Sequence, residues 1–552
     1  MFSSTETIVG KIWAELLHLD KINPDDNFFA IGGDSLMTIE MLIRTGDAFG
    51  VDACPENIAD TPTLREFCHA IDMKRSVITP MPDNGESETD SGGIIHRAGK
   101  GNIPVSFIQE QMVGAELAGL YDPKKNRSHC LDLCYRIKGA INIPALDRAL
   151  REIVQRHEIL RTGYRFIDGT IYQHVNDAPQ SILRVEDLRH LAQNDWEHET
   201  EIILKKIAAK SFSFFYDKLM IAATLIVGEM EHILAVVVNH IAIDGLSMKI
   251  LKDELFLLYR VFSHNAASPL VELPIQYSDF AVWEREYFSG DRLESKLAYW
   301  RRLAKEPINT MLPVDHTPTV FSYTGAIVPV TILSEPTARL RQLARDCKVT
   351  LFNVLFAAFI ALIHTFSGYR YNFFCIPVGN KLRETRSLIG CFMNFQLIYV
   401  DMSGNPTFLE IVERLQRALR DAYENYVPFY FITREMPPQG DLVDFQLLTA
   451  PDESTNPPEL SLSRFKLQTQ EFGLFPIDVY LLDSAETITG HFKYQTAVYE
   501  RKTILDMVDG YMSLLTMAAR DPYVRLSDMG IGNLREPRIL RCASLENAHL
   551  SQ

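Results

Sequence analysis

The chain has 552 residues, of which 47% are apolar and 23% charged, and its formal net charge is -16. A single core does not grow to that length, so two to four folding units are expected. The negative charge argues against a nucleic-acid partner, which needs a basic surface. The longest apolar run, Val354 to Ile363, falls short of the roughly 20 residues that cross a bilayer, so no membrane span is expected.

The eight cysteines are scattered, without a CxxC pair or a Cys/His cluster at metal-ligand spacing. They predict reduced thiols in a cytoplasmic protein and no metal site. The N-terminal residues lack the basic region and small-residue cleavage site of an export signal, which agrees with a cytoplasmic location. Cys391 is expected to be a packed core thiol rather than a nucleophile.

Residues 1–75 are predicted to form a small helical domain, with helices over Glu6–Leu19 and Thr63–Ile71. The expected apolar face of the first helix consists of Ile8, Ile12, Leu16 and Leu19. Between the helices, Ser35 follows two glycines and an aspartate, at a position typical of a helix N-cap. It is either a simple cap or an exposed hydroxyl that a transferase can reach. Residues 76–101 are rich in Pro, Gly, Ser and acids, which predicts a flexible linker.

Residues 102–540 show a continuous α/β pattern that is too long for one compact core. We expect an N-lobe of about residues 102–275 and a C-lobe of about residues 276–540. The predicted strands are Cys130–Ile137, Thr170–Val175, Ile477–Leu482 and Thr487–Tyr494, and the predicted helices are Pro144–Arg156, Thr350–Phe366 and Thr503–Ala519.

A run of β-branched residues from Ile233 predicts a buried strand that ends at His240, with Asp244 and Gly245 shortly after it. Alone this pattern is weak, because a histidine after an apolar strand is more often a core residue than a catalyst. A more specific, ordered set surrounds it: Ser106-Phe-Ile-Gln109, Arg156-His157-Glu158-x-Leu160-Arg161-Thr162, Asn239-His240-x-x-x-Asp244-Gly245-x-Ser247, Tyr277-x-Asp279-Phe-Ala-Val-Trp283, Ile389-Gly390-x-Phe392-x-Asn394 and Pro428-Phe429.

In this order and at these separations, the motifs of residues 103–534 resemble the condensation domains of nonribosomal peptide synthetases. The run Asp26-Asn27-Phe28-Phe29-x-Ile31-Gly32-Gly33-Asp34-Ser35-Leu36 resembles the phosphopantetheine attachment motif of peptidyl carrier domains. Together they imply a small four-helix carrier domain, followed by two chloramphenicol-acetyltransferase-like α/β lobes in a V with the active site on a tunnel between them.

The resemblance also implies residue roles. Ser35 would receive covalent 4'-phosphopantetheine from a phosphopantetheinyl transferase. His240 corresponds to the second histidine of the family's HHxxxDG motif, and would take the proton from the attacking amine or orient that amine and stabilise the tetrahedral intermediate. Asp244 would pair with Arg161 and fix the loop beneath His240, as a carboxylate and a guanidinium can. Gly245 would leave space for its backbone N–H to approach a substrate group.

The sequence departs from the family at a few positions. Asn239 stands where the first histidine of the motif is usual. Because successive side chains on a strand point to opposite faces, Asn239 is not expected to share the position of His240. Gln111 and Val113 replace an arginine and a tryptophan near the tunnel entrance.

Structural roles are expected for most other motif residues. Tyr277 and Trp283 are expected to pack at the junction of the lobes, and Arg156 and His157 to hold the end of a helix. Asn394 either lines the tunnel or satisfies backbone groups, and the sequence does not decide between these roles.

The function that the resemblance implies is that of an acyltransferase, a carrier-condensation didomain. It would join a donor acyl or peptidyl thioester on the Ser35 arm to an amine on a downstream acceptor carrier. No adenylation domain is recognised, so one upstream or in trans would activate the donor. The alternatives are chain release with a free amine or alcohol, and a non-catalytic platform that recruits a partner enzyme to the carrier. An acyltransferase using coenzyme A shares the HxxxD pattern but gives no reason for a fused carrier.

Overall fold

The computed structural model describes residues 3–17, 19, 21–28, 31, 41–42, 44–45, 48–49, 63–77, 94, 96, 102–117, 130–191, 193–208, 219–306, 312–318, 324–368, 371–379, 382–436, 442–449, 457, 459–465, 475–484 and 486–529. The predicted attachment residue Ser35 lies outside these residues.

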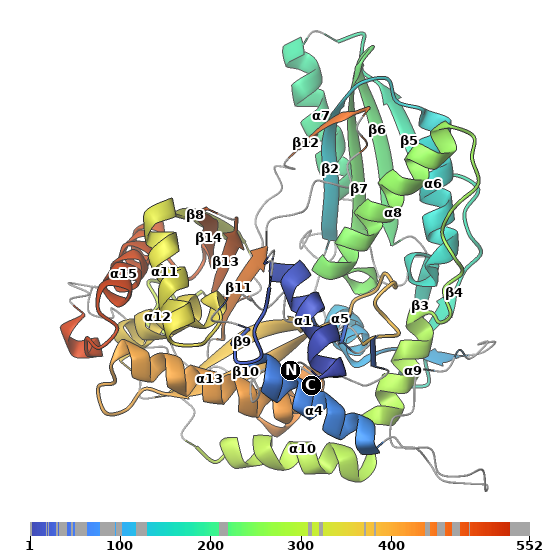
Figure 1. Ribbon diagram of the computed structural model, residues 1–552. Coiled ribbons are helices and arrows are strands. Elements are labelled where there is room, and N and C mark those ends of the chain that lie inside the picture. Colours follow the sequence, from blue (N-terminus) through green and yellow to red (C-terminus); the bar gives the residue numbers. More distant parts are fainter. Residues whose placement is uncertain are drawn as a thin grey trace, which may run out of the picture.

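The helices described in the N-terminal region are α1 (Ser4–Leu17) and α4 (Leu64–Val77) (Figure 1). They pack around a small core of their own, in which Trp13 is fully buried and contacts Phe28 edge-on with ring centroids 4.9 Å apart. The predicted apolar face of the first helix is right for Ile12 and Leu16, which pack against this core, and wrong for Ile8 and Leu19, which are 41% and 39% exposed. Val9 is fully buried in their place. The large indole determines which side of the helix faces the core, since its burial gains more than that of an aliphatic side chain.

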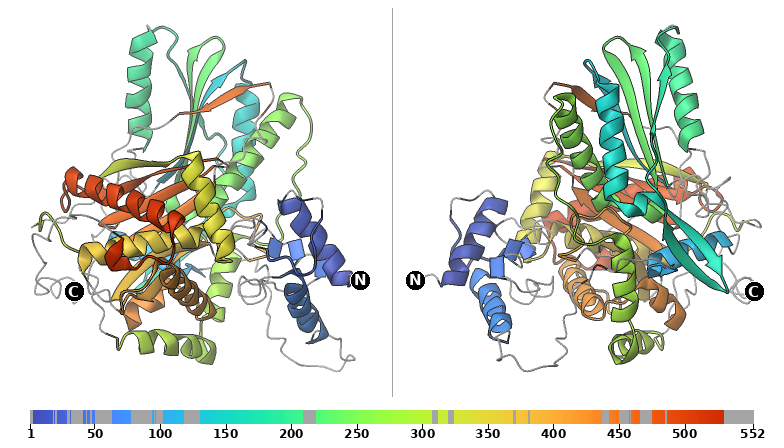
Figure 2. Two further views of the ribbon diagram at one scale, coloured as in Figure 1. Left: turned by 60° about the vertical axis from the view of Figure 1, so that its left-hand side comes forward. Right: turned by 90° about the vertical axis from the view of Figure 1, so that its right-hand side faces the viewer.

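The N-lobe contains β2 (Cys130–Lys138), α6 (Ile143–Arg156), β5 (Leu183–Asp187), α7 (Gln193–Ala208), β6 (Met220–Gly228), β7 (Glu231–Asn239) and α8 (Gly245–Ser263). Its sheet has the strand order β12-β2-β7-β6-β5, so β7 is central. Helices α6 and α8 cover one face and α7 covers the other, as Figures 1 and 2 show. Since both faces are covered, every residue from Ile233 to Asn239 is buried, which accounts for the continuous apolar run that precedes Asn239.

A small sheet beside the N-lobe consists of β1 (Ile103–Pro104), β4 (Thr170–Val175) and β3 (Thr162–Ile167), in that order. The short helix α5 (Phe107–Leu117) follows β1, and the 3-10 turn η1 (Glu158–Arg161) connects α6 to β3. Strand β4 has the bounds that the sequence predicted.

The C-lobe contains β8 (Gly325–Ile332), α11 (Ser334–Asp346), α12 (Leu351–Ser367), β9 (Tyr371–Gly379), β10 (Met393–Asp401), α13 (Phe408–Glu424), α14 (Phe429–Glu435), β11 (Val443–Thr449), β13 (Ile477–Asp483), β14 (Ile488–Gln495), α15 (Arg501–Arg520) and η3 (Leu526–Asp528). Its sheet has the order β10-β9-β11-β13-β14-β8. The apolar helix α12 is the centre of this lobe. Thr350 caps it by accepting a bond from Asn353 N, and Gly368 ends it with a φ of 70°.

The two lobes are connected by more than the chain between them. Helix α9 (Tyr277–Tyr287) leads to α10 (Gly290–Leu303). Phe280 packs in the N-lobe core and Phe288 in the C-lobe core, so the passage between the cores lies between these residues. Strand β12 (Ser461–Arg464) returns from the C-lobe to pair antiparallel with β2 (Figure 1).

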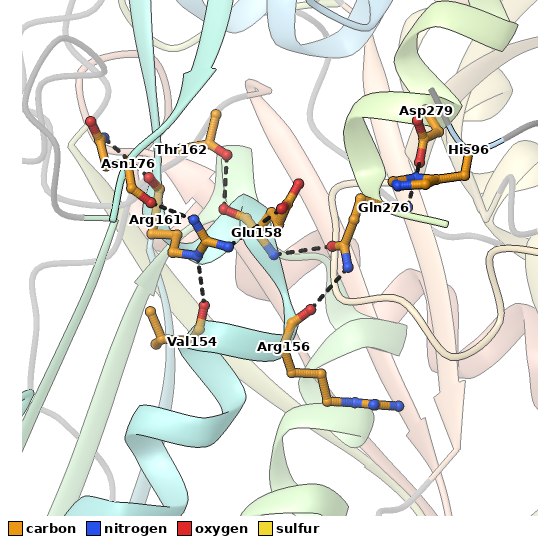
Figure 3. A network of polar contacts seen from close by, with 9 residues as sticks. All are labelled: His96, Val154, Arg156, Glu158, Arg161, Thr162, Asn176, Gln276 and Asp279. Carbon is orange, nitrogen blue, oxygen red and sulfur yellow. Dashed lines mark hydrogen bonds and ion pairs between the residues drawn. The ribbon is translucent and has the colours of Figure 1, made fainter. Parts of the chain in front are cut away.

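Two residues of the predicted linker contact the large domain. Ile94 is 8% exposed and packs in the N-lobe core. Nδ1 of His96 lies 2.9 Å from Oδ2 of Asp279 in the first turn of α9, a contact drawn in Figure 3. The segment that precedes the large domain is therefore anchored at these two positions.

Within the described residues, no single helix is long and apolar enough to cross a membrane, and only α11 and α12 together, bent by 103°, meet that test. Every cysteine in the described part of the chain is free. No group of three metal-ligand side chains occurs there.

Candidate active site

His240 lies where the central strand β7 ends. The side chain of Asn239 accepts a hydrogen bond from Ile241 N at 3.0 Å, which turns the chain into the short 3-10 helix η2 (His240–Ala242). Asn239 is fully buried, whereas His240 is partly exposed. This difference in exposure fits the expectation that Asn239 does not share the position of His240.

Asp244 is the N-cap of α8 and is 3% exposed. Its Oδ1 accepts a bond from Ser247 N at 2.8 Å, and its Oδ2 accepts one from Phe392 N at 2.9 Å. Its own N–H donates to Gly390 O at 3.1 Å. Backbone N–H groups from both lobes therefore stabilise this buried carboxylate.

Arg161 does not contact Asp244, so the predicted ion pair is wrong. The guanidinium donates to the backbone carbonyls of Val154, at 3.3 Å, and of Asn176, and Nη2 lies 3.4 Å from Glu158 Oε1. Figure 3 shows these contacts around the end of α6. The physical reason is that both carboxylate oxygens of Asp244 already accept bonds from backbone N–H groups, while Arg161 binds the carbonyls nearest to it.

The C-lobe residues 388–392 are called the bridging segment below. Its side chains Leu388, Ile389 and Phe392 pack in the N-lobe core. Ser247 Oγ donates to Gly390 O at 2.9 Å and accepts a bond from Gly390 N at 3.2 Å. A Cβ atom on Gly390 would lie 2.2 Å from a ring carbon of Tyr277, so glycine is required where the segment crosses this ring. The bridging segment is thereby fixed to the loop that follows His240.

Tyr277 connects α9 to the same segment. Its hydroxyl donates to Cys391 O at 2.7 Å and lies 2.9 Å from Ser106 Oγ. Burial raises the pKa of Tyr277 well above its usual range, which keeps the hydroxyl neutral and able to donate. Trp283 stacks between Phe280 and Tyr287. Packing near the lobe junction, the predicted role of Tyr277 and Trp283, is confirmed.

His157 holds more than the end of a helix. Its backbone N–H donates to Ile153 O at the end of α6, as a residue holding the helix end should. Its ring Nδ1 accepts a bond from Ile389 N at 3.2 Å, and Nε2 lies 2.9 Å from Glu254 Oε2. Arg156 donates to the other oxygen of Glu254 at 3.0 Å. The contact with the bridging segment was missed by sequence reasoning, because nothing in the local sequence indicates it.

Gly245 is the first residue of α8 and is exposed. A Cβ atom added there would meet nothing within 4 Å. The first N–H groups of a helix have no acceptor within the helix. The space beside the Cα of Gly245 is therefore open.

Cys391 is fully buried, which confirms the prediction of a core thiol. Burial raises the pKa of this thiol well above its usual range. Its Sγ lies 3.9 Å from Nδ1 of His240. Sequence reasoning did not find this contact, although the motif around Gly390 had drawn attention to the segment.

Asn394 satisfies backbone groups, which decides between its two predicted roles. Its Oδ1 accepts bonds from Phe395 N at 2.8 Å and from Phe429 N at 3.0 Å. Its Nδ2 donates to the hydroxyl of Tyr426 at 2.9 Å, and the side chain is 4% exposed. Asn394 therefore fixes the start of α14 to β10.

Comparisons with known proteins match two parts of the chain to known families. The profile of the family described as "Condensation domain" matches residues 100–540, and that described as "Phosphopantetheine attachment site" matches residues 8–71. One of the linear gramicidin synthase proteins of Brevibacillus parabrevis is 30% identical over 94% of this chain, and the dimodular nonribosomal peptide synthase of Bacillus subtilis is 27% identical over 96%. The chain spans 7% and 22% of the lengths of these two relatives.

Solved structures share the fold of the large domain. The complex of the X-domain and OxyB from teicoplanin biosynthesis includes a chain with a TM-score of 0.71 and 23% identity, covering 81% of this chain and 100% of that one. The first condensation domain of the calcium-dependent antibiotic synthetase, in complex with a substrate analogue, has a TM-score of 0.64 and 19% identity, covering 77% and 98%. At this level of identity the likeness concerns the fold alone.

Proposed function

Since this chain belongs to the condensation-domain family of nonribosomal peptide synthetases and carries a phosphopantetheine attachment site ahead of that domain, we propose that it catalyses amide formation between an acyl or peptidyl thioester on its own carrier and an acceptor amine. The observation that carries the proposal is the placement of His240. His240 is partly exposed at the lobe junction, on a loop that backbone bonds from both lobes hold in place. A catalytic imidazole needs both access to substrate and a fixed position.

The reaction transfers an acyl group from sulfur to nitrogen. The acceptor nitrogen attacks the thioester carbonyl, the C–N bond forms, the C–S bond breaks, and one proton passes from nitrogen to the departing sulfur. His240 takes up that proton and returns it, or orients the amine by a hydrogen bond. Its Nε2 makes no hydrogen bond within the residues that the structure describes, so it is available for either role.

The other site residues support this step. Asp244 is a positioning residue, because its carboxylate holds the backbone on either side of the lobe junction. Gly245, at the start of α8, has free space beside its Cα, and its backbone N–H is the proposed donor to the negative oxygen of the tetrahedral intermediate. Arg161 acts further away, by holding the end of α6 and η1 beside the small sheet.

Ser35 is the proposed attachment residue. The segment that contains it joins Phe28 to Met41, and both of these side chains are fully buried in the core of the N-terminal region. Its two ends are thus held by that core, which fits a serine presented by a small helical domain. Bound there, phosphopantetheine supplies the thiol that carries the donor acyl group. The expected partners are a phosphopantetheinyl transferase, an adenylation domain upstream or in trans, and an acceptor carrier.

Intact-protein mass spectrometry tests the proposal on the full chain. A phosphopantetheinyl transferase loads candidate acyl-pantetheine groups, an amine or an amine-loaded acceptor carrier is added, and the loss of acyl mass is followed with time. His240→Ala is expected to slow the transfer by roughly 10²- to 10⁴-fold, and Ser35→Ala to prevent loading. A matched control is His264→Ala, at the exposed C-terminal end of the same helix α8, which is expected to leave the rate unchanged.

The same assay separates the alternatives. Transfer only to a free amine or alcohol indicates chain release rather than elongation. A non-catalytic platform has one observation in its favour, namely the similar fold of an X-domain solved in complex with OxyB. The platform hypothesis predicts the same loss of acyl mass from the unaltered chain and from His240→Ala. If His240→Ala transfers the acyl group as fast as the unaltered chain, the platform hypothesis replaces the proposal of amide formation.

A further inference from the structure

A cysteine of the C-lobe stands directly behind the imidazole. Cys391 Sγ and His240 Nδ1 are 3.9 Å apart, although the two residues are 151 positions apart in the chain. Taking the proposed function as given, we propose that Cys391 is a positioning residue that holds the ring of His240 from the Nδ1 side and leaves Nε2 toward the substrate. The contact places one part of the catalytic unit on each lobe.

The position of this thiol is fixed by its neighbours in the chain. On one side, Gly390 exchanges hydrogen bonds with Ser247 and accepts one from Asp244 N. On the other side, Phe392 N donates to the carboxylate of Asp244. The carbonyl of Cys391 itself accepts a bond from a tyrosine hydroxyl. Because these bonds end on the loop that carries the histidine, the sulfur and the ring move together.

The chemistry of a neutral thiol suits this place. Burial raises the pKa of Cys391, so the group stays protonated, and a thiol is both a weak donor and a weak acceptor. As a weak acceptor, the sulfur faces the N–H of Nδ1 and restricts the orientation of the ring. The nearest acid in the loop, Asp244, instead accepts bonds from backbone N–H groups. With the ring proton on Nδ1, the lone pair of Nε2 can take up a proton and return it.

The thiol has no nucleophilic part in this proposal. It is fully buried and protonated, whereas a nucleophilic cysteine needs access and a thiolate. Its effect is exerted only through the orientation of His240. Loss of the contact should therefore slow the chemical step without weakening the binding of acceptor.

The test compares Cys391→Ala and Cys391→Ser with Cys134→Ala in the full loaded chain. Cys134 is also fully buried, but it lies on the face of the N-lobe sheet that α7 covers. Cys391→Ala is expected to lower kcat about tenfold with KM unchanged, because a misplaced catalytic group loses rate steeply. Cys391→Ser keeps a polar contact and should recover part of the loss. Cys134→Ala should reduce thermal stability similarly and leave kcat unchanged.

A second measurement does not need turnover. Imidazole ¹⁵N shifts of histidine-labelled protein report which ring nitrogen of His240 carries the proton, and the His240→Ala variant assigns the signal. The signal should change in Cys391→Ala and stay in Cys134→Ala. Equal kcat values and unchanged ¹⁵N shifts in Cys391→Ala would overturn the inference, while a fully active His240→Ala protein would overturn the proposed function instead.

Discussion

The absence of contact between Asp244 and Arg161 has a measurable consequence in a double-mutant cycle. Asp244→Asn removes a buried carboxylate that accepts two backbone N–H bonds and leaves an amide that can accept only one of them. We expect a loss of about 2 kcal/mol in the free energy of unfolding. Arg161→Gln removes bonds to two backbone carbonyls and is expected to cost about 1–2 kcal/mol.

The two losses should add. Residues without a shared partner are additive to within about 0.5 kcal/mol, whereas residues in contact show coupling of roughly 0.5–3 kcal/mol. Differential scanning calorimetry of the full chain measures each variant, and Asp244→Asn should lower the midpoint by roughly 4–8 °C for a unit of this size. A cycle on the buried pair His157 and Glu254, 2.9 Å apart, is the control that should show coupling. A coupling above about 1 kcal/mol between Asp244 and Arg161 would refute the geometry described above.

Three further predictions concern other parts of the fold. Gly390→Ala should destabilise the lobe junction by about 1–3 kcal/mol through steric overlap with an aromatic ring, measured by calorimetry. The hydrogen bond to Asp279 raises the pKa of His96 above 6.5. The contribution of the His96–Asp279 contact to stability is therefore complete below about pH 6.5 and is lost as the pH rises through the raised pKa. An NMR titration of His96 follows this change. Burial and the nearby Asp478 raise the pKa of Asp444 well above 3.8. Ionisation of Asp444 therefore reduces the stability of the fold as the pH rises above about 4. Asp444→Asn should raise the melting midpoint more at pH 8 than at pH 5.

Each of these has a matched control. Gly114→Ala lies in a helix, where an added Cβ would meet nothing within 4 Å, and should not destabilise. Asp279→Asn should return the His96 titration toward 6.5, and a midpoint that does not move would contradict the assigned cause. Asp253→Asn replaces a carboxylate that is not buried; if it raised the midpoint as much as Asp444→Asn, burial would not be the cause of the effect.

Local features of the fold were predictable from the sequence. The start of α12 at Thr350 and its end at Gly368 follow from capping, which depends only on adjacent residues. The central strand was predicted from its continuous apolar run, since both faces of the sheet are covered. The same run placed His240 at the end of that strand, and the order of motifs along the chain then indicated the family.

The remainder depends on contacts between residues far apart in the sequence. Ser247 and Gly390 are 143 positions apart, and His157 and Ile389 are 232 apart. No period or spacing shows that these backbone groups would bind the side chains of the N-lobe. For the same reason the partner of Asp244 was predicted as a side-chain cation, although the structure supplies backbone N–H groups from the opposite lobe.

Strand β12 limits how the large domain can be divided into separate lobes. It comes from the C-lobe and covers the outer edge of β2 from Tyr135 to Lys138. An N-lobe produced by itself would present this unpaired strand edge to other molecules and would be prone to aggregate. Hybrid synthetases made by exchanging one lobe would pair this edge with a strand from another parent, so a chimera that preserves the large domain should keep both lobes and the returning strand from one parent.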